Sequence, residues 1–137
     1  MGLDIGDRRI GVAFSDPMGI LASPFTIIDR SDETADVAAI IDIINQQQVG
    51  QIVVGLPFSM NGKLGRQAEK VKAFTQKLCE QIVVPVEFRD ERLTTVAARR
   101  LMQATRVKKS RKKVRDDAVA AALILQGYID EEHGAEL

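Results

Sequence analysis

The 137 residues predict an α/β fold in which a mixed five-stranded sheet carries helices on both faces. Three short apolar runs separated by polar turns fill the first 28 residues, and this pattern predicts antiparallel strands. Two further apolar runs follow at 51–56 and 83–88, each after a segment with helical periodicity, which favours parallel strands joined by helices. The length suits one domain, so we expect residues 1–137 to share a single core.

The antiparallel part is expected to be a simple meander. Its strands are predicted at 1–6, 10–14 and 24–28. After this meander the apolar residues recur at helical spacing, at Val37, Ile40, Ile41 and Ile44. Ser31 or Asp32 can cap the N-terminus of that helix.

The second half alternates strands and helices. The run at 51–56 is almost wholly apolar, which is typical of a parallel strand buried on both faces. A loop then leads to an amphipathic helix over 68–78 and to the strand at 83–88. The remaining elements are expected to be a helix over 93–102, a basic loop over 105–115 and an apolar helix over 117–129.

Asp4 lies inside the first apolar run, where a carboxylate is costly unless it is paired, protonated or bound to a metal. Asp90 and Glu91 close a later strand, and Asp116 and Asp117 open the last helix. Carboxylates from three elements would suit a hard divalent cation, and ligands collect at the carboxyl ends of parallel strands. Taken singly, however, an acid at a helix N-terminus is more often a cap, and Asp90 could simply belong to a turn.

Other catalytic chemistries find few candidates. The single histidine, His133, lies in an acidic C-terminal stretch that we expect to be frayed, so a histidine base is not expected. The sequence contains no GxSxG elbow, no Cys–His pairing near Cys79 and no P-loop motif. A hydrolase with these residues would depend on carboxylate-held metal, with two Mg²⁺ or Mn²⁺ ions acting on a phosphodiester.

The net charge of zero conceals a strong segregation of sign. Residues 51–115 carry 16 basic and 5 acidic residues, whereas residues 116–137 carry 6 acidic residues and no Lys or Arg. The stretch 105–115 is basic without any acid, which predicts a loop that contacts a polyanion, the alternative being a merely solvated loop. Arg8, Arg9 and Arg92 could touch a phosphate or orient a carboxylate.

The compartment predicted from composition is the cytoplasm. The lone Cys79 cannot form an internal disulfide, and its helical, mostly apolar neighbourhood predicts a packed thiol. No apolar run approaches the roughly 18 residues of a membrane span, and no signal-peptide pattern is visible. We therefore expect no membrane partner.

Four blocks of the sequence resemble the YqgF family of bacterial proteins, which are described as Holliday-junction-resolvase-like and as pre-16S rRNA nucleases. The blocks occur in family order and span nearly the whole chain: GLDIGDRRIGVA at 2–13, VGLP with MNG at 54–57 and 60–62, DERLTT at 90–95, and DAVAA with ILQ at 117–121 and 124–126. One such block would be weak evidence, but four in register are specific.

The resemblance implies an RNase H-like fold and a metal-dependent nuclease, a hydrolase that processes the 5′ end of the 16S rRNA precursor. Its motifs make Asp4, Glu91 and Asp117 the catalytic residues and the ligands of two Mg²⁺ or Mn²⁺ ions, with Asp90 as the competitor of Glu91. The residues expected to bind nucleic acid are Arg8, Arg9, Arg92, Lys108, Lys109, Arg111, Lys112 and Lys113.

Three other functions are compatible with parts of this pattern. Branched DNA, in a Holliday-junction resolvase, is the alternative substrate to structured RNA. A nucleic-acid-binding factor without catalysis would keep the same fold and basic loop. An ATP-binding protein of the actin and sugar-kinase class also has an Asp-x-Gly turn after its first strand, but 137 residues cannot supply its second half. The pattern leaves a monomer or a weak homodimer open.

Overall fold

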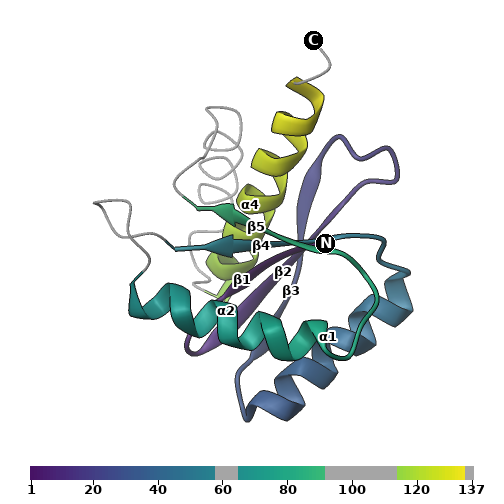
Figure 1. The fold of residues 1–137 in the computed structure, drawn as a ribbon. Coiled ribbons are helices and arrows are strands. Elements are labelled where there is room, and N and C mark those ends of the chain that lie inside the picture. The colour runs from purple at the N-terminus through teal and green to yellow at the C-terminus, as the bar shows by residue number, and fades with distance from the viewer. Residues whose placement is uncertain (58–64, 92–113, 135–137) are drawn as a thin grey trace.

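The computed structural model describes residues 1–57, 65–91 and 114–134, with the backbone alone for 114–117 and 134 (Figure 1). Its elements are β1 (Gly2–Ile5), β2 (Arg9–Ser15), β3 (Ala22–Asp29), α1 (Glu33–Gln47), β4 (Ile52–Leu56), α2 (Arg66–Cys79), β5 (Val86–Asp90) and α4 (Val114–Gly134). The five strands form one sheet in the order β3-β2-β1-β4-β5. β1, β2 and β3 are antiparallel, and β4 and β5 run parallel to β1. The predicted mixed sheet is confirmed.

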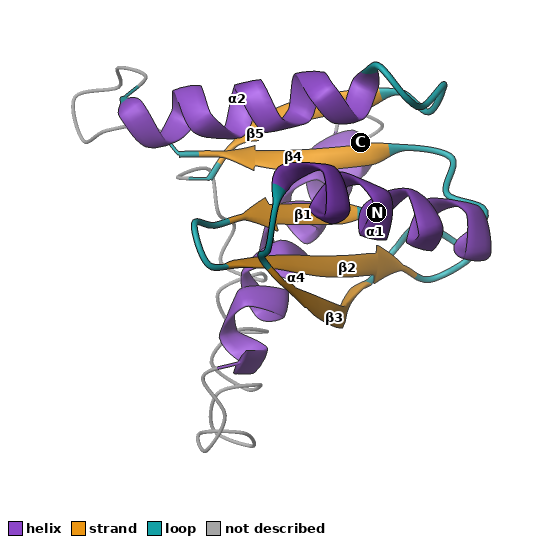
Figure 2. Ribbon diagram, turned by 90° about the horizontal axis from the view of Figure 1, so that it is seen from below, coloured by secondary structure: helices purple, strands orange, loops and turns teal. Residues whose placement is uncertain are grey.

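Helices cover both faces of the sheet, as predicted. α1 and α2 lie on one face and α4 lies on the other (Figure 2). Alternate residues of the same strands pack against the two helical layers, because successive side chains of a strand point to opposite faces of the sheet. Thus Val54 packs with the α1 and α2 layer, whereas Val53 packs against Ile124 of α4. This is why β4 is apolar at nearly every position.

Asp32 is the N-cap of α1. Its side chain accepts a hydrogen bond from the Ala35 N–H at 2.8 Å, which settles the choice between Ser31 and Asp32.

The start of α1 also contains a buried ion pair that the sequence pattern did not predict. Asp36 is only 2% exposed and accepts from Arg30 Nε at 2.9 Å and from the Ser31 N–H at 3.0 Å. Although burial alone would raise the pKa of Asp36, these bonds lower it.

Three expectations about element ends and one about the burial of a side chain are wrong. β5 begins at Val86 rather than at 83, because its ladder with β4 begins opposite Ile52 and leaves Val83 fully exposed. The last helix begins at Val114, so the end of the predicted basic loop is helical. It also continues to residue 134 instead of fraying, and His133 contacts the Gly19 carbonyl oxygen at 2.9 Å. Cys79 is exposed at the end of α2, not packed.

The predicted helix over 93–102 and most of the basic loop lie outside the described residues. In the described part of the chain, no helix combines the length and apolarity that crossing a membrane requires.

Candidate active site

Asp4 and Glu91 meet on the face of the sheet that α4 covers. Asp4 belongs to β1, and Glu91 follows directly after β5, where its N–H donates to the Leu56 carbonyl at 3.2 Å. β4 lies between β1 and β5 in the sheet. Gly55 of β4 leaves room for the acid: a Cβ atom at this position would lie 2.8 Å from Glu91 Oε1 and 2.9 Å from its Cγ. The Glu91 side chain therefore lies across the bare backbone of Gly55.

A small cavity opens beside the two acids. It has a volume of about 140 Å³ and is lined by Asp4, Glu91, Ala120, Leu123 and Ile124. At roughly 30 Å³ for each water molecule, the space suits a few waters or a partly hydrated cation. Three of the five lining residues belong to α4, so this helix forms the apolar wall of a site whose polar wall is the sheet.

The electrostatics of the pair favour the uptake of positive charge. Burial, the neighbouring Asp4 carboxylate, a hydrogen bond with Asp4 and the charge of Asp90 together raise the pKa of Glu91 to about 7. Two carboxylates can share a hydrogen bond only if one of them carries a proton. The pair thus takes up a proton as the pH falls through about 7, and a cation could take the place of that proton.

Substitution of Glu91 by Gln should change how stability depends on pH in the metal-free protein. A carboxyl whose pKa is raised on folding stabilises the fold fully below its unfolded pKa of about 4.5, and this contribution is lost as the pH rises through about 7. Glu91→Gln cannot titrate, so the variant should gain stability relative to the parent between pH 5 and pH 8. Urea unfolding in EDTA measures this; a stability difference that does not change with pH would contradict it.

Asp90, the competing acid, lies on the opposite side of β5 from Arg89. Its Cα partner in the ladder is Leu56, a residue of the α1 and α2 layer, while Arg89 faces α4 beside Gly127. The structure thus brings Glu91, rather than Asp90, next to Asp4.

The other predicted site residues are only partly described. Asp117 lies near the start of α4, where the structure describes the backbone alone. Arg8 is exposed in the turn after β1, and Arg9 makes a 3.8 Å ion pair with Asp29. Arg92 and the basic residues Lys108, Lys109, Arg111, Lys112 and Lys113 lie outside the described ranges. Among side chains that are described, no three potential metal ligands cluster, and Asp4 and Glu91 form a pair of carboxyl groups.

Two residues that shape the site were not predicted from the sequence. Gly55 seats Glu91, and the available signal was a glycine in the middle of an otherwise apolar strand, which often marks a close approach. Arg89 is 6% exposed beneath α4. Its signal was weaker, because an arginine in a short edge strand is usually solvated.

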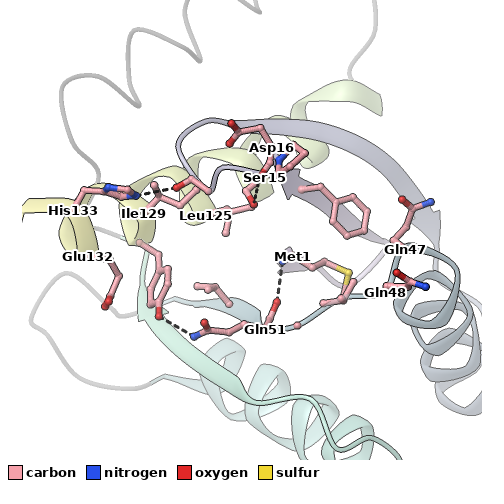
Figure 3. Close-up of a pocket in the computed structure, with 17 residues that line it drawn as sticks. Met1, Ser15, Asp16, Gln47, Gln48, Gln51, Leu125, Ile129, Glu132 and His133 are labelled. Carbon is pink, nitrogen blue, oxygen red and sulfur yellow. Dashed lines mark hydrogen bonds between the residues drawn. The ribbon is translucent and has the colours of Figure 1, made fainter.

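A larger cavity, of about 480 Å³, lies at the opposite end of the sheet (Figure 3). It is bordered by Met1 before β1, Ser15 at the end of β2 and Gln51 before β4. Its acids come from separate elements, and Asp16 already accepts the N–H groups of Ile20 and Leu21. The larger cavity therefore offers no carboxylate pair comparable with Asp4 and Glu91.

Comparison with known proteins identifies the family of the chain. The chain matches the family model described as "RuvX: Holliday junction resolvase" over residues 1–131. A relative from Moorella thermoacetica named "Putative pre-16S rRNA nuclease" is 48% identical over 130 residues, which cover 95% of this chain and 93% of the relative. A relative of the same name from Dehalococcoides mccartyi is 50% identical over 127 residues, covering 93% and 94% of the two chains.

Solved structures share the fold at low sequence identity. RuvC of T. thermophilus, in complex with a Holliday junction substrate, has a TM-score of 0.62 and 14% identity and covers 97% of this chain and 94% of its own. The Fowlpox virus resolvase in complex with Holliday junction DNA has a TM-score of 0.55 and 12% identity and covers 96% of both chains. These likenesses confirm the RNase H-like fold. The chain therefore belongs to the RuvX family, the one that its sequence blocks resemble under the name YqgF.

Proposed function

We propose that this protein is a metal-dependent nuclease that hydrolyses phosphodiester bonds and matures the 5′ end of the 16S rRNA precursor. The observation that carries the proposal is the carboxyl pair of Asp4 and Glu91, which are half-buried beside a small cavity and hydrogen-bonded to each other. Membership of the RuvX family and the names of the relatives support the reaction class and the substrate. The chain acts as one nuclease domain over residues 1–137, in the cytoplasm.

Asp117 is the third member of the proposed site. It precedes Ala120 by three residues and Ile124 by seven, a spacing that repeats along one face of a helix. Ala120 and Ile124 both line the cavity beside Asp4 and Glu91. One helical turn therefore separates Asp117 from the cavity wall, and its carboxylate is our proposed third ligand.

The donor set fits Mg²⁺ or Mn²⁺. Carboxylate oxygens are the ligands that these hard cations prefer, and the raised pKa of Glu91 reports a site that favours added positive charge. Two such ions, when bound, supply an activated water and stabilise the leaving oxygen of the phosphodiester. Asp4, Glu91 and Asp117 would hold these ions, while Leu123 and Ile124 would exclude bulk water from the α4 side.

In this proposal, basic residues hold the backbone of the nucleic acid. Arg8 is exposed in the turn that follows β1. It lies three residues after Ile5, the last residue of that strand. Arg9 and Arg92 are further proposed phosphate contacts, with the basic residues of 108–113. Basic residues are needed because a site made of carboxylates repels phosphate until bound metal makes the local charge positive.

Cleavage assays with two labelled substrates test this proposal. The purified protein is incubated with a pre-16S-like RNA and with a four-way DNA junction, in Mg²⁺, Mn²⁺ or EDTA. We expect metal-dependent cutting of the RNA near the mature 5′ end. Binding without cutting in any metal would favour a non-catalytic nucleic-acid-binding factor instead.

A Holliday-junction resolvase is the second candidate function. The description of the matching family model, a Holliday junction resolvase, favours branched DNA. The same assay separates the two candidates, because symmetrical nicking of the junction with intact RNA would assign the DNA activity.

Removal of the loop charges should weaken binding uniformly across sequences. Changing Lys108, Lys109, Lys112 and Lys113 together to Ala should lower the slope of log affinity against log salt by up to about 0.9 for each phosphate that the variant no longer neutralises. Changing Lys70, Lys72 and Lys77 of α2 to Ala is the control, because α2 lies on the other face of the sheet from α4. Filter binding between about 50 and 200 mM salt gives the slopes; equal slopes in the loop variant and the parent would refute the role of the loop.

A further inference from the structure

Arg89 is buried between the edge strand β5 and α4, and only 5% of its side chain is exposed. Its Nη2 donates to Glu131 of α4 at 3.0 Å, and its Nη1 is 3.4 Å from the Asp90 carbonyl oxygen. Burying a guanidinium costs several kcal/mol, which its partners repay only in good geometry, whereas an apolar side chain of similar length would fill the same space without that cost. Packing alone does not explain an arginine here.

The guanidinium lies face-on against Gly127 of α4. A Cβ atom at Gly127 would lie 2.6 Å from Arg89 Cζ and 2.8 Å from both Nη1 and Nη2, and such nearly equal distances place it over the flat face of the group. Because Gly127 has no side chain, the helix backbone packs directly against the guanidinium of Arg89. Glu131, four residues further along the helix, holds the edge of the same group. The arginine contacts α4 at two successive turns.

The contact between Arg89 and α4 lies next to the proposed metal site. Arg89 and Glu91 are two residues apart and both face α4, where Arg89 meets Gly127 and Glu91 lies close to Ile124 over Gly55. Ile124 and Gly127 are one helical turn apart. Both contacts therefore join the same strand to the same helix, so a slide of the helix at Arg89 would also move the cavity wall at Glu91.

We propose that Arg89 is a positioning residue that fixes the register of α4 against β5 and so holds the ligand set of the metal site in place. This inference rests on the proposed function, because the geometry it maintains is that of a cation site. Arg89 touches neither metal nor nucleic acid in this role. It acts through Glu91, two residues further along the chain, and through α4, the helix whose first turn carries the third proposed ligand.

Two variants test this role by different routes. Arg89→Met keeps much of the length of the side chain and removes the pair with Glu131. Gly127→Ala keeps the charge but pushes the guanidinium away, while Ala favours helix over Gly, so the fold should be retained. Asp36→Asn is the control for general destabilisation, because it breaks a buried pair on the α1 and α2 side of the sheet.

The measurement is Mn²⁺ affinity by calorimetry, together with kcat and KM on the cleaved substrate. We expect Arg89→Met and Gly127→Ala to weaken Mn²⁺ binding by about tenfold to a hundredfold, with kcat reduced and KM for nucleic acid unchanged. Asp36→Asn should lower the urea midpoint but leave the Mn²⁺ affinity at the parental value.

The outcomes separate this inference from the proposed function. Parental Mn²⁺ affinity in both Arg89→Met and Gly127→Ala, with binding abolished in Asp4→Asn, would overturn the role of Arg89 and leave the nuclease proposal standing. A loss of Mn²⁺ affinity in Asp36→Asn as large as that in Arg89→Met would also overturn the role of Arg89, because any destabilisation of the protein would then weaken the site. If the parent protein binds no Mn²⁺, the proposed function fails, and the positioning role fails with it.

Discussion

Replacing Asp4 with Asn should abolish metal-dependent cleavage, lowering kcat by about a thousandfold or more. Asn has nearly the same shape as Asp but lacks the charge, so the change removes an anionic ligand with little effect on packing. Bound metal supplies several kcal/mol of charge stabilisation in the transition state, and about 4 kcal/mol corresponds to a thousandfold in rate. Single-turnover cleavage with saturating Mn²⁺ measures the loss.

The same substitution should make the metal-free protein more stable above pH 7. The charge of Asp4 raises the pKa of Glu91, so its removal allows Glu91 to ionise without repulsion. Loss of cleavage together with a gain in stability would rule out misfolding as the cause. Asp42→Asn, a change at an exposed position of α1, is the matched control and should alter neither property. Cutting that survives in Asp4→Asn would refute the proposed ligand set.

Replacing Gly55 with Ala should have the second-largest effect, because one added methyl group enters the space of both site walls. The new Cβ would lie 2.3 Å from Ile124 Cδ1 and 2.8 Å from Glu91 Oε1, distances at which something must move. Either α4 is lifted or Glu91 is displaced from Asp4. We expect a destabilisation of about 1–3 kcal/mol, typical of overpacking, and at least a tenfold loss of Mn²⁺ affinity.

Gly50→Ala is the control for this change. A Cβ at Gly50 meets nothing within 4 Å, so the same substitution there adds a methyl group in open space. Urea unfolding and Mn²⁺ titration on the two variants separate the local clash from the general effect of replacing glycine. Parental Mn²⁺ affinity in Gly55→Ala would show that metal binding does not depend on the close contact between Glu91 and the backbone of Gly55.

The fold was predictable because the periodicity of the apolar residues is strong. The continuous apolar run of β4 indicated a parallel strand buried on both faces, and the helical spacing of Val37 and Ile40 indicated α1; both are confirmed. Element ends were less predictable. The strand propensity of Val83 was misleading, because the start of β5 is set by its pairing with Ile52 of β4 rather than by propensity.

The acid pair was also predictable, because a carboxylate in an apolar strand is costly unless a proton, a partner or a metal offsets its charge. The sequence left Asp90 and Glu91 open, because the choice depends on which face each side chain takes at the end of β5. The support of the site could not be predicted. The seat of Glu91 on Gly55 and the contact between Arg89 and Gly127 arise from the approach of α4 to the sheet, which periodicity does not encode.

The central claim is that Asp4 and Glu91 are ligands of a divalent cation, and a calorimetric Mn²⁺ titration tests it most directly. Titration at about pH 6.5, just below the pKa of Glu91, in two buffers of different ionisation enthalpy gives both the affinity and the number of protons released. We expect saturable binding that releases about one proton from the carboxyl pair, and loss of that binding in Asp4→Asn. Binding that releases no proton and is unchanged in Asp4→Asn, or no saturable binding at all, would contradict the claim.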